Sequence, residues 1–94
     1  MATSYNNIGV VYERKGDYDN ALLQHHRALE IRTRVFGSEH PSVADTKENI
    51  GLVYEKTEKK SEAKTLFTEA AEIRRAKLGP DHPDTKKAER LAAQ

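Results

Sequence analysis

Apolar residues recur at helical spacing through the first third of the chain. Within residues 5–12 they follow the i, i+3, i+4, i+7 spacing that places side chains on one face of an amphipathic helix. A second stripe of the same kind runs through residues 18–36. The pattern therefore predicts two amphipathic helices. Their inward residues are expected to be Tyr5, Ile8, Gly9 and Tyr12 in the first, and Tyr18, Ala21, Leu22, His25, Ala28, Leu29, Arg32, Val35 and Phe36 in the second.

Residues that favour helix ends stand where these stripes stop. Gly16 suits a helix C-terminus, and the carboxylate of Asp17 can accept hydrogen bonds from the free N–H groups that open the next helix. Gly37 is expected to end the second helix. Pro41 is expected at the first position of a third helix, where its missing N–H costs nothing.

The same order of residues returns after 42 positions. Residues 5–46 laid over residues 47–88 give 14 identical pairs without a gap, including a connector that reads FGSEHPS in one copy and LGPDHPD in the other. Identity at a constant offset indicates a repeat architecture. The second copy predicts two more helices, the later one with Ser61 as its N-cap. A fifth helix is expected at about 83–93, with Ala88, Leu91 and Ala92 as its apolar face.

Two glycines lie inside predicted helices, where glycine is less favourable than alanine by about 1 kcal/mol. Gly9 and Gly51 hold equivalent positions in the two copies, which predicts that a neighbouring helix approaches the backbone closely at both. We expect Tyr12 and Tyr54 to fill the space beside each glycine. The flat facing surface is expected to come from Ala21, Ala28, Ala63 and Ala70.

Composition narrows the class of protein. The chain has 94 residues, enough for one small domain, and a hydrophobic content of 36% without tryptophan allows only a thin core. The absence of cysteine excludes a disulfide framework, a thiolate zinc site and a cysteine nucleophile. No apolar run approaches the ~18 residues of a membrane helix, so we expect a soluble, cytoplasmic protein that does not bind membranes.

The charge balance does not favour nucleic acid as a partner. The chain carries 16 Lys and Arg against 15 Asp and Glu, and its basic cluster at residues 56–64 is interleaved with glutamates. A nucleic-acid surface is usually more uniformly basic and carries aromatic side chains. The sequence therefore predicts no nucleic-acid partner and leaves an acidic protein partner open for this cluster.

The side chains that could support metal binding or catalysis are not arranged for either. His25 and His26 are adjacent and point about 100° apart on a helix, so they cannot bind one ion together. His40 and His82 lie in successive connectors, where we expect each imidazole to hydrogen-bond locally. The serines and the aspartate near His40 lack the oriented base and oxyanion donors of a catalytic triad. We therefore expect no enzyme activity, no metal and no cofactor.

The first copy resembles a tetratricopeptide repeat (TPR). The stretch NIGVVYERKGDYDNALLQHHRALEI has an Asn-Leu-Gly-like triad, a tyrosine three residues after the glycine, Gly-Asp-Tyr at the turn and spaced alanines. The 42-residue spacing and the Gly-x-x-His-Pro connector resemble the repeats of kinesin light chains and nephrocystin-like proteins. The resemblance implies an all-α fold, a right-handed superhelical stack of antiparallel helix pairs. This α-solenoid would contain two repeats, 5–46 and 47–88, and a terminal helix, within a single domain spanning residues 1–94.

The same resemblance implies a function in protein–protein interaction. In this family the first helix of each pair lines a concave groove that holds a peptide or helix of a partner protein, and the Asn of the triad commonly hydrogen-bonds the peptide backbone. Asn7 and Asn49 occupy that place here, although an amide used in helix packing is the alternative. We interpret the chain as an excerpt of a longer array or a minimal repeat unit. The implied groove residues are Asn6, Asn7, Val10, Glu13, Arg14, Glu48, Asn49, Leu52, Glu55 and Lys56.

A second hypothesis is self-association. A solenoid usually needs about three repeats with polar caps, and this chain has two and a half. Its first helix would expose Tyr5, Ile8 and Tyr12 on the side where a preceding repeat would sit. The last helix offers only Leu91 as a large apolar residue, and in the third copy of the triad no Asn continues the series. The alternative prediction is a homo-oligomer formed through the end helices.

Overall fold

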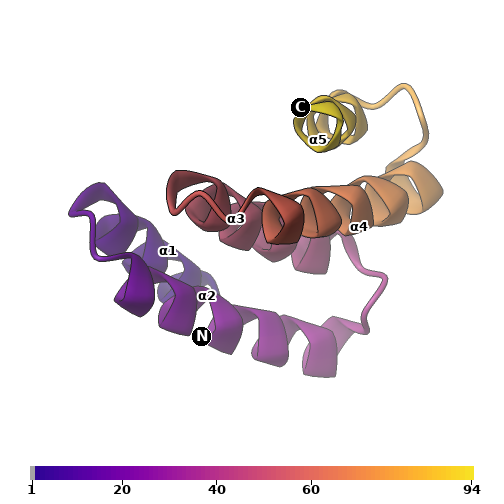
Figure 1. Ribbon diagram of the computed structural model, residues 1–94. Helices are drawn as coiled ribbons and strands as arrows, with labels where there is room; N and C mark the ends of the chain where they lie inside the picture. The colour runs from indigo at the N-terminus through magenta and orange to yellow at the C-terminus, as the bar shows by residue number, and fades with distance from the viewer. Residues whose placement is uncertain (1) are drawn as a thin grey trace.

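The computed structural model describes residues 2–94, with side chains from Ser4 onward, and these residues form five helices and no strand (Figure 1). Each helix packs against the next one along the chain, so that the helices stack in sequence order. This arrangement confirms the all-α helical-repeat solenoid that the sequence predicts. The helices are α1 (Ala2–Arg14), α2 (Tyr18–Phe36), α3 (Pro41–Lys56), α4 (Lys60–Leu78) and α5 (Pro83–Ala93).

The turns within the two helix pairs have the same geometry although their sequences differ. Gly16 has φ 80°, and Glu58 takes the equivalent position with φ 64°. In both turns the next residue donates its N–H to the carbonyl oxygen of a tyrosine in the last turn of the preceding helix. The distance is 2.9 Å from Asp17 to Tyr12 and 2.8 Å from Lys59 to Tyr54, and the two tyrosines hold equivalent positions in the repeats. The left-handed conformation costs a residue with a side chain roughly 1–2 kcal/mol. Glu58 therefore holds this turn in a strained form that Gly16 adopts freely.

The N-termini of α2 and α4 are capped differently. Asp17 accepts a hydrogen bond from the N–H of Asn20, as predicted. The prediction that Ser61 caps α4 is wrong, because α4 begins at Lys60 and its N-cap position is Lys59, which makes no side-chain capping bond. The 42-residue register places Lys59 where Asp17 stands in the first copy, so Ser61 falls in the first helical turn.

Both connectors use histidine to begin the next helix. Nδ1 of His40 accepts from the N–H of Ser42 at 3.0 Å, and Nδ1 of His82 accepts from the N–H of Asp84 at 3.1 Å. The ring of His40 also stacks on Phe36, with 4.5 Å between the ring centroids. The two imidazoles thus supply local capping bonds, which confirms the predicted local role.

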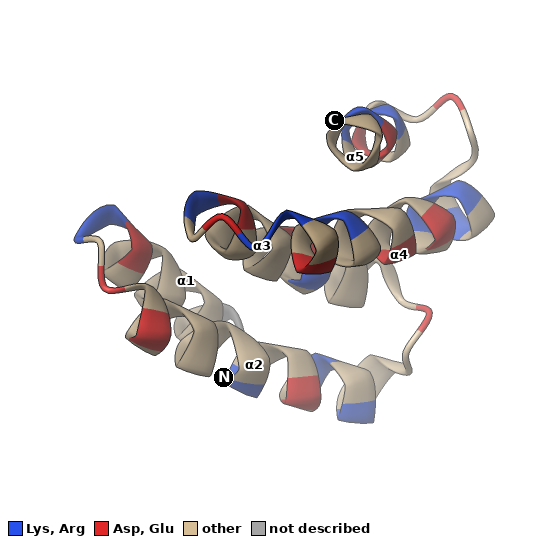
Figure 2. Cartoon of the chain, viewed as in Figure 1, with Lys and Arg blue, Asp and Glu red and all other residues tan. Residues whose placement is uncertain are grey.

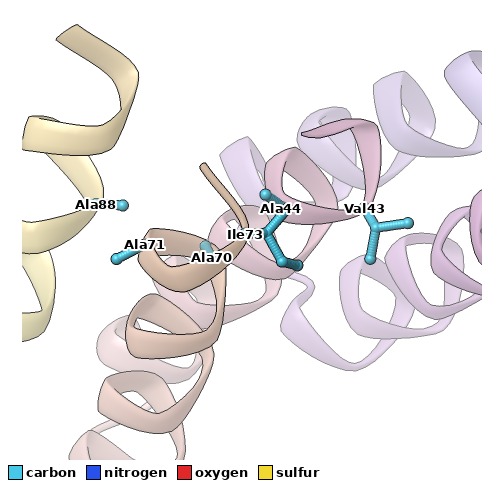
Figure 3. Close-up of a cluster of buried hydrophobic side chains, with 6 residues drawn as sticks. All are labelled: Val43, Ala44, Ala70, Ala71, Ile73 and Ala88. Carbon is cyan, nitrogen blue, oxygen red and sulfur yellow. The ribbon is translucent and has the colours of Figure 1, made fainter. Parts of the chain in front are cut away.

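A cluster of buried apolar residues lies between α3, α4 and α5 (Figure 3). Alanine dominates it, so these helices come close together while burying little apolar surface. In contrast, the only buried residue of α1 from Ser4 onward is Gly9. The core is therefore concentrated in the C-terminal half of the chain. Its members are Val43, Ala44, Ala70, Ala71, Ile73 and Ala88, with the partly buried Leu29 packed against them.

Each helical glycine faces an aromatic ring. A Cβ atom on Gly51 would lie 2.7 Å from Cε1 of Phe67, and one on Gly9 would lie 2.8 Å from Cε1 of His25. The close helix approach is confirmed, but the facing surface is a ring and not the predicted alanines. The four predicted alanines are nevertheless buried. They are Ala21, Ala28, Ala63 and Ala70.

Candidate functional site

Side chains of α1 and α3 are joined along one face of the molecule. Nδ2 of Asn49 on α3 donates to Oδ1 of Asn6 on α1 at 2.9 Å. Further along the same two helices, Nζ of Lys56 donates to Oε2 of Glu13 at 2.8 Å. These contacts place the first helices of the two pairs side by side. We call the surface they form the odd-helix face, defined by Asn6, Asn7, Val10, Glu13, Arg14, Asn49, Leu52, Glu55 and Lys56.

Asn7 and Asn49, which hold equivalent positions in the two copies, have different surroundings. Asn7 is exposed, and the half-buried Asn49 bonds to Asn6, its neighbour in the other repeat. A side-chain amide carries two N–H donors and one acceptor oxygen, so this bond uses only part of its capacity. Asn49 therefore combines a packing role with donor and acceptor capacity that a peptide backbone could use.

An ion pair borders the amides. The hydrogen bond from Lys56 to Glu13, together with the charge of that carboxylate, raises the pKa of Lys56 above its ordinary value. Exposed pairs of this kind contribute little to stability. The pair is a second side-chain contact between α1 and α3. Around it, Val10, Leu52 and Glu55 are half-buried and Arg14 is exposed.

Glu48, which the family resemblance places in the groove, lies inside the structure. It is 5% exposed, and its Oε1 accepts a hydrogen bond from Nη1 of Arg74 at 2.7 Å. Its other oxygen lies 3.4 Å from Nζ of Lys87 on α5. Arg74 also binds Oδ1 of Asp45 at 2.8 Å and the carbonyl oxygen of Asp84 at 3.2 Å. Glu48 thus joins α3 to α4 and α5, and we leave it out of the odd-helix face.

Arg74 keeps its charge in this buried position. Burial by itself would lower the pKa of the guanidinium, but the hydrogen bonds to Asp45 and Glu48 outweigh burial and raise it. Sequence analysis missed this cluster, although a signal was present. Arginine occurs at the same place on the apolar stripe of both copies, and Arg32 binds the carbonyl of Ser42 just as Arg74 binds that of Asp84.

A groove that the sequence did not predict lies between the start of α4 and the end of α5. Ala63, Phe67 and Leu91 supply its apolar residues. Lys60 lines it at the position where the first repeat has Tyr18, and an aromatic ring there would fill much of the space. The replacement of an aromatic residue by Lys60 was therefore the feature of the sequence that could have indicated this groove. The groove measures about 310 Å³ and is completed by Glu55, Lys64 and Gln94.

Charges of both signs are distributed over the helices. Figure 2 shows both acidic and basic residues on the helices, and no helix carries one sign of charge alone. Within residues 2–94 there is no group of three or more His, Asp or Glu side chains placed to hold a metal ion. None of the described helices is long and apolar enough to cross a membrane.

The outer side of α1 differs from the same side of α3. Ile8 and Val11 are 44% and 49% exposed, whereas the equivalent Ile50 and Val53 are fully buried. The cause is packing, because α3 lies between α2 and α4 while α1 packs on α2. α1 therefore presents an apolar strip that its counterpart in the second repeat buries.

Comparisons with known proteins agree on the architecture. A family model described as tetratricopeptide repeat matches residues 1–76. The crystal structure of BtubC (BKLC) from P. vanneervenii is similar to this chain with a TM-score of 0.83 and 23% sequence identity. The match covers 93% of this chain and 34% of that one, so the chain spans about a third of the length of BtubC. A search of curated proteins finds no match.

Proposed function

Because the chain belongs to the tetratricopeptide repeat family, whose members act as protein–protein interaction scaffolds, we propose that its odd-helix face binds a peptide segment or helix of a partner protein. The observation that carries this proposal is Asn49, a half-buried amide with unused donor and acceptor capacity. Val10 and Leu52 are partly exposed on the same face and offer apolar contact to the side chains of a bound peptide.

The test uses peptides selected from a library against the wild-type protein. Asn49→Ala should weaken their binding about tenfold, because the loss of one well-formed hydrogen bond costs about 1.4 kcal/mol. Binding is measured by fluorescence anisotropy, and melting temperature is recorded for each variant.

The matched control is Asn6→Ala. It removes the same Asn6–Asn49 bond but keeps the amide of Asn49 on the face. If Asn49 is the main contact to the peptide backbone, Asn49→Ala weakens binding more than Asn6→Ala does, while both variants lose similar stability. Equal losses of binding and of melting temperature in the two variants would show that Asn49 serves packing alone and would contradict the proposal.

A second candidate function is self-association through α1. It is favoured by the exposed strip of Ile8 and Val11, whose equivalents in the second repeat are buried by neighbouring helices. Burial of this strip against another copy would remove its apolar surface from water, which is the main driving force of association.

Light scattering at several protein concentrations tests this candidate. The wild type should form dimers or longer assemblies as its concentration rises, and the double change Ile8→Glu with Val11→Glu should abolish them. Leu23→Glu is the control, because Leu23 on α2 is 45% exposed but lies outside the strip. A folded wild type that stays monomeric up to millimolar concentration would exclude this function.

A further inference from the structure

His25 is buried without a hydrogen-bond partner. Its side chain on α2 is 0% exposed, and neither Nδ1 nor Nε2 has a partner among the described residues. Buried polar atoms in native proteins are nearly always hydrogen-bonded, so an exception calls for an explanation. The ring lies directly beneath Gly9, where three of its atoms would come within 2.9 Å of a Cβ. The ring of His25 on α2 therefore packs directly against the backbone of α1 at Gly9.

The second repeat shows that the nitrogens are not needed for packing. Phe67 takes the same position on α4 and lies beneath Gly51 in the same way. A phenyl ring fills such a site with no polar atom to satisfy. The first repeat therefore carries a titratable ring at a place where the fold requires only a flat one.

The charged groups around His25 provide no hydrogen-bond acceptor for it. From α1 the nearest carboxylate is that of Glu13, which already pairs with Lys56 of α3. On α2 itself, His26 is the adjacent residue, and Arg27 lies over the ring of Tyr5 across the seam between α1 and α2. Burial lowers the pKa of His25; the charge of Glu13 opposes this shift in part, and His26 adds to it.

We propose that His25 makes the contact between α1 and α2 a pH-sensitive latch, which holds α1 while the imidazole is neutral and releases it when the ring is protonated. An imidazolium beneath Gly9 would be a buried charge without an acceptor, which is strongly unfavourable. Movement of α1 away from α2 lets water reach the ring. From Ser4 onward this helix contributes no large side chain to the buried core, so it can move away without exposing one.

The direction of the pH effect follows from the two protonation states. In the open form His25 is solvated and titrates near the ordinary value of about 6.5, whereas in the closed form its pKa is lower. The open form therefore binds more protons as the pH falls, and closure weakens. The latch is fully closed above the open-state pKa and loses up to about a factor of ten in its equilibrium constant per pH unit below it.

Release of α1 would also dismantle part of the odd-helix face. The Asn6–Asn49 and Glu13–Lys56 contacts both cross from α1 to α3 and would be lost. The latch itself needs no peptide, so it can be tested on the protein alone, independently of any binding function.

Hydrogen exchange read by mass spectrometry at pH 7.5 and pH 5.5 tests the latch, after correction for the intrinsic exchange rate. We expect the protection of the α1 amides to fall up to about tenfold in the wild type and to remain constant in His25→Phe. His26→Gln is the control, since His26 is exposed and has the smallest of the three effects on the pKa of His25, so most of the wild-type response should remain. His40 and His82 are present in all three proteins, so the comparison among the variants isolates the contribution of His25.

Nuclear magnetic resonance of the His25 ring provides a measurement that needs no variant. Its nitrogens should report a neutral ring for as long as the α1 signals remain native, and protonation should coincide with the loss of those signals. The proposal is overturned if His25 becomes protonated while α1 stays protected. It is equally overturned if the α1 amides of His25→Phe respond to pH as the wild type does.

Discussion

Arg74→Met is expected to lower the free energy of unfolding by about 3–5 kcal/mol. The substitution removes the cation that neutralises Glu48, which would remain 5% exposed with only Lys87 at 3.4 Å. A buried carboxylate without a close partner is costly. For a domain of this length the whole stability is on the order of 5–14 kcal/mol, so the loss is a large part of it. Urea unfolding followed by circular dichroism at pH 7 measures the difference.

Two further variants distinguish the cost of leaving a buried charge unpaired from the cost of lost packing. Arg74→Met combined with Glu48→Leu removes both charges, and we expect it to recover most of the lost stability, because replacing a buried ion pair by apolar residues is often neutral. Arg75→Met tests the neighbouring arginine, which is exposed and pairs with Glu89 on the surface, and it should change stability little. A double variant as unstable as Arg74→Met alone would contradict this explanation.

The helices could be predicted because their signals are local. Apolar spacing gives the helical faces, and Gly16, Gly37 and Pro41 mark where helices end and begin. The same logic failed at Ser61, where residue preference alone suggested a cap. The register of the repeat decides the helix start instead, and it places Lys59 at the N-cap despite its poor capping ability.

The arrangement of the candidate site could be predicted only in part. Family resemblance selects residues of α1 and α3, but it does not show which of these side chains are buried or paired with other parts of the chain. Glu48 is buried because Arg74 arrives from α4 and Lys87 from α5, and neither contact is visible from the spacing within α3. Asn49 bonds Asn6 for a similar reason, since the partner lies in the other repeat. Long-range side-chain pairing therefore sets the limit of the sequence-based prediction.

The two ring-on-glycine contacts show how one structural solution can differ in chemistry. Sequence analysis identified Gly9 and Gly51 as points of close approach and expected Tyr12 and Tyr54 beside them. The structure places His25 and Phe67 there, at equivalent positions of the two repeats. Geometry is kept while polarity changes, and the proposed pH sensitivity of the contact between α1 and α2 rests on this difference.

Gly51→Ala is expected to destabilise the protein by about 1–3 kcal/mol, although alanine is the better helix former by about 1 kcal/mol. The added Cβ would lie 2.7 Å from Cε1 of Phe67, and that ring is itself buried between α3 and α4 and cannot move away freely. The two effects have opposite signs, so the sign of the measured change shows which one dominates. Urea unfolding at pH 7 gives this change directly.

Relief of the clash provides the control. Phe67→Leu alone should lower the free energy of unfolding, since it removes a buried ring. Added to Gly51→Ala, it should lower that free energy by less than it does on its own, because the smaller side chain leaves room for the new methyl group. Gly9→Ala should cost less than Gly51→Ala, because α1 packs mainly on α2 and can shift outward, whereas α3 is held between α2 and α4. If Gly51→Ala raises stability, helix propensity outweighs the contact, and glycine is not required for the close approach of the two helices.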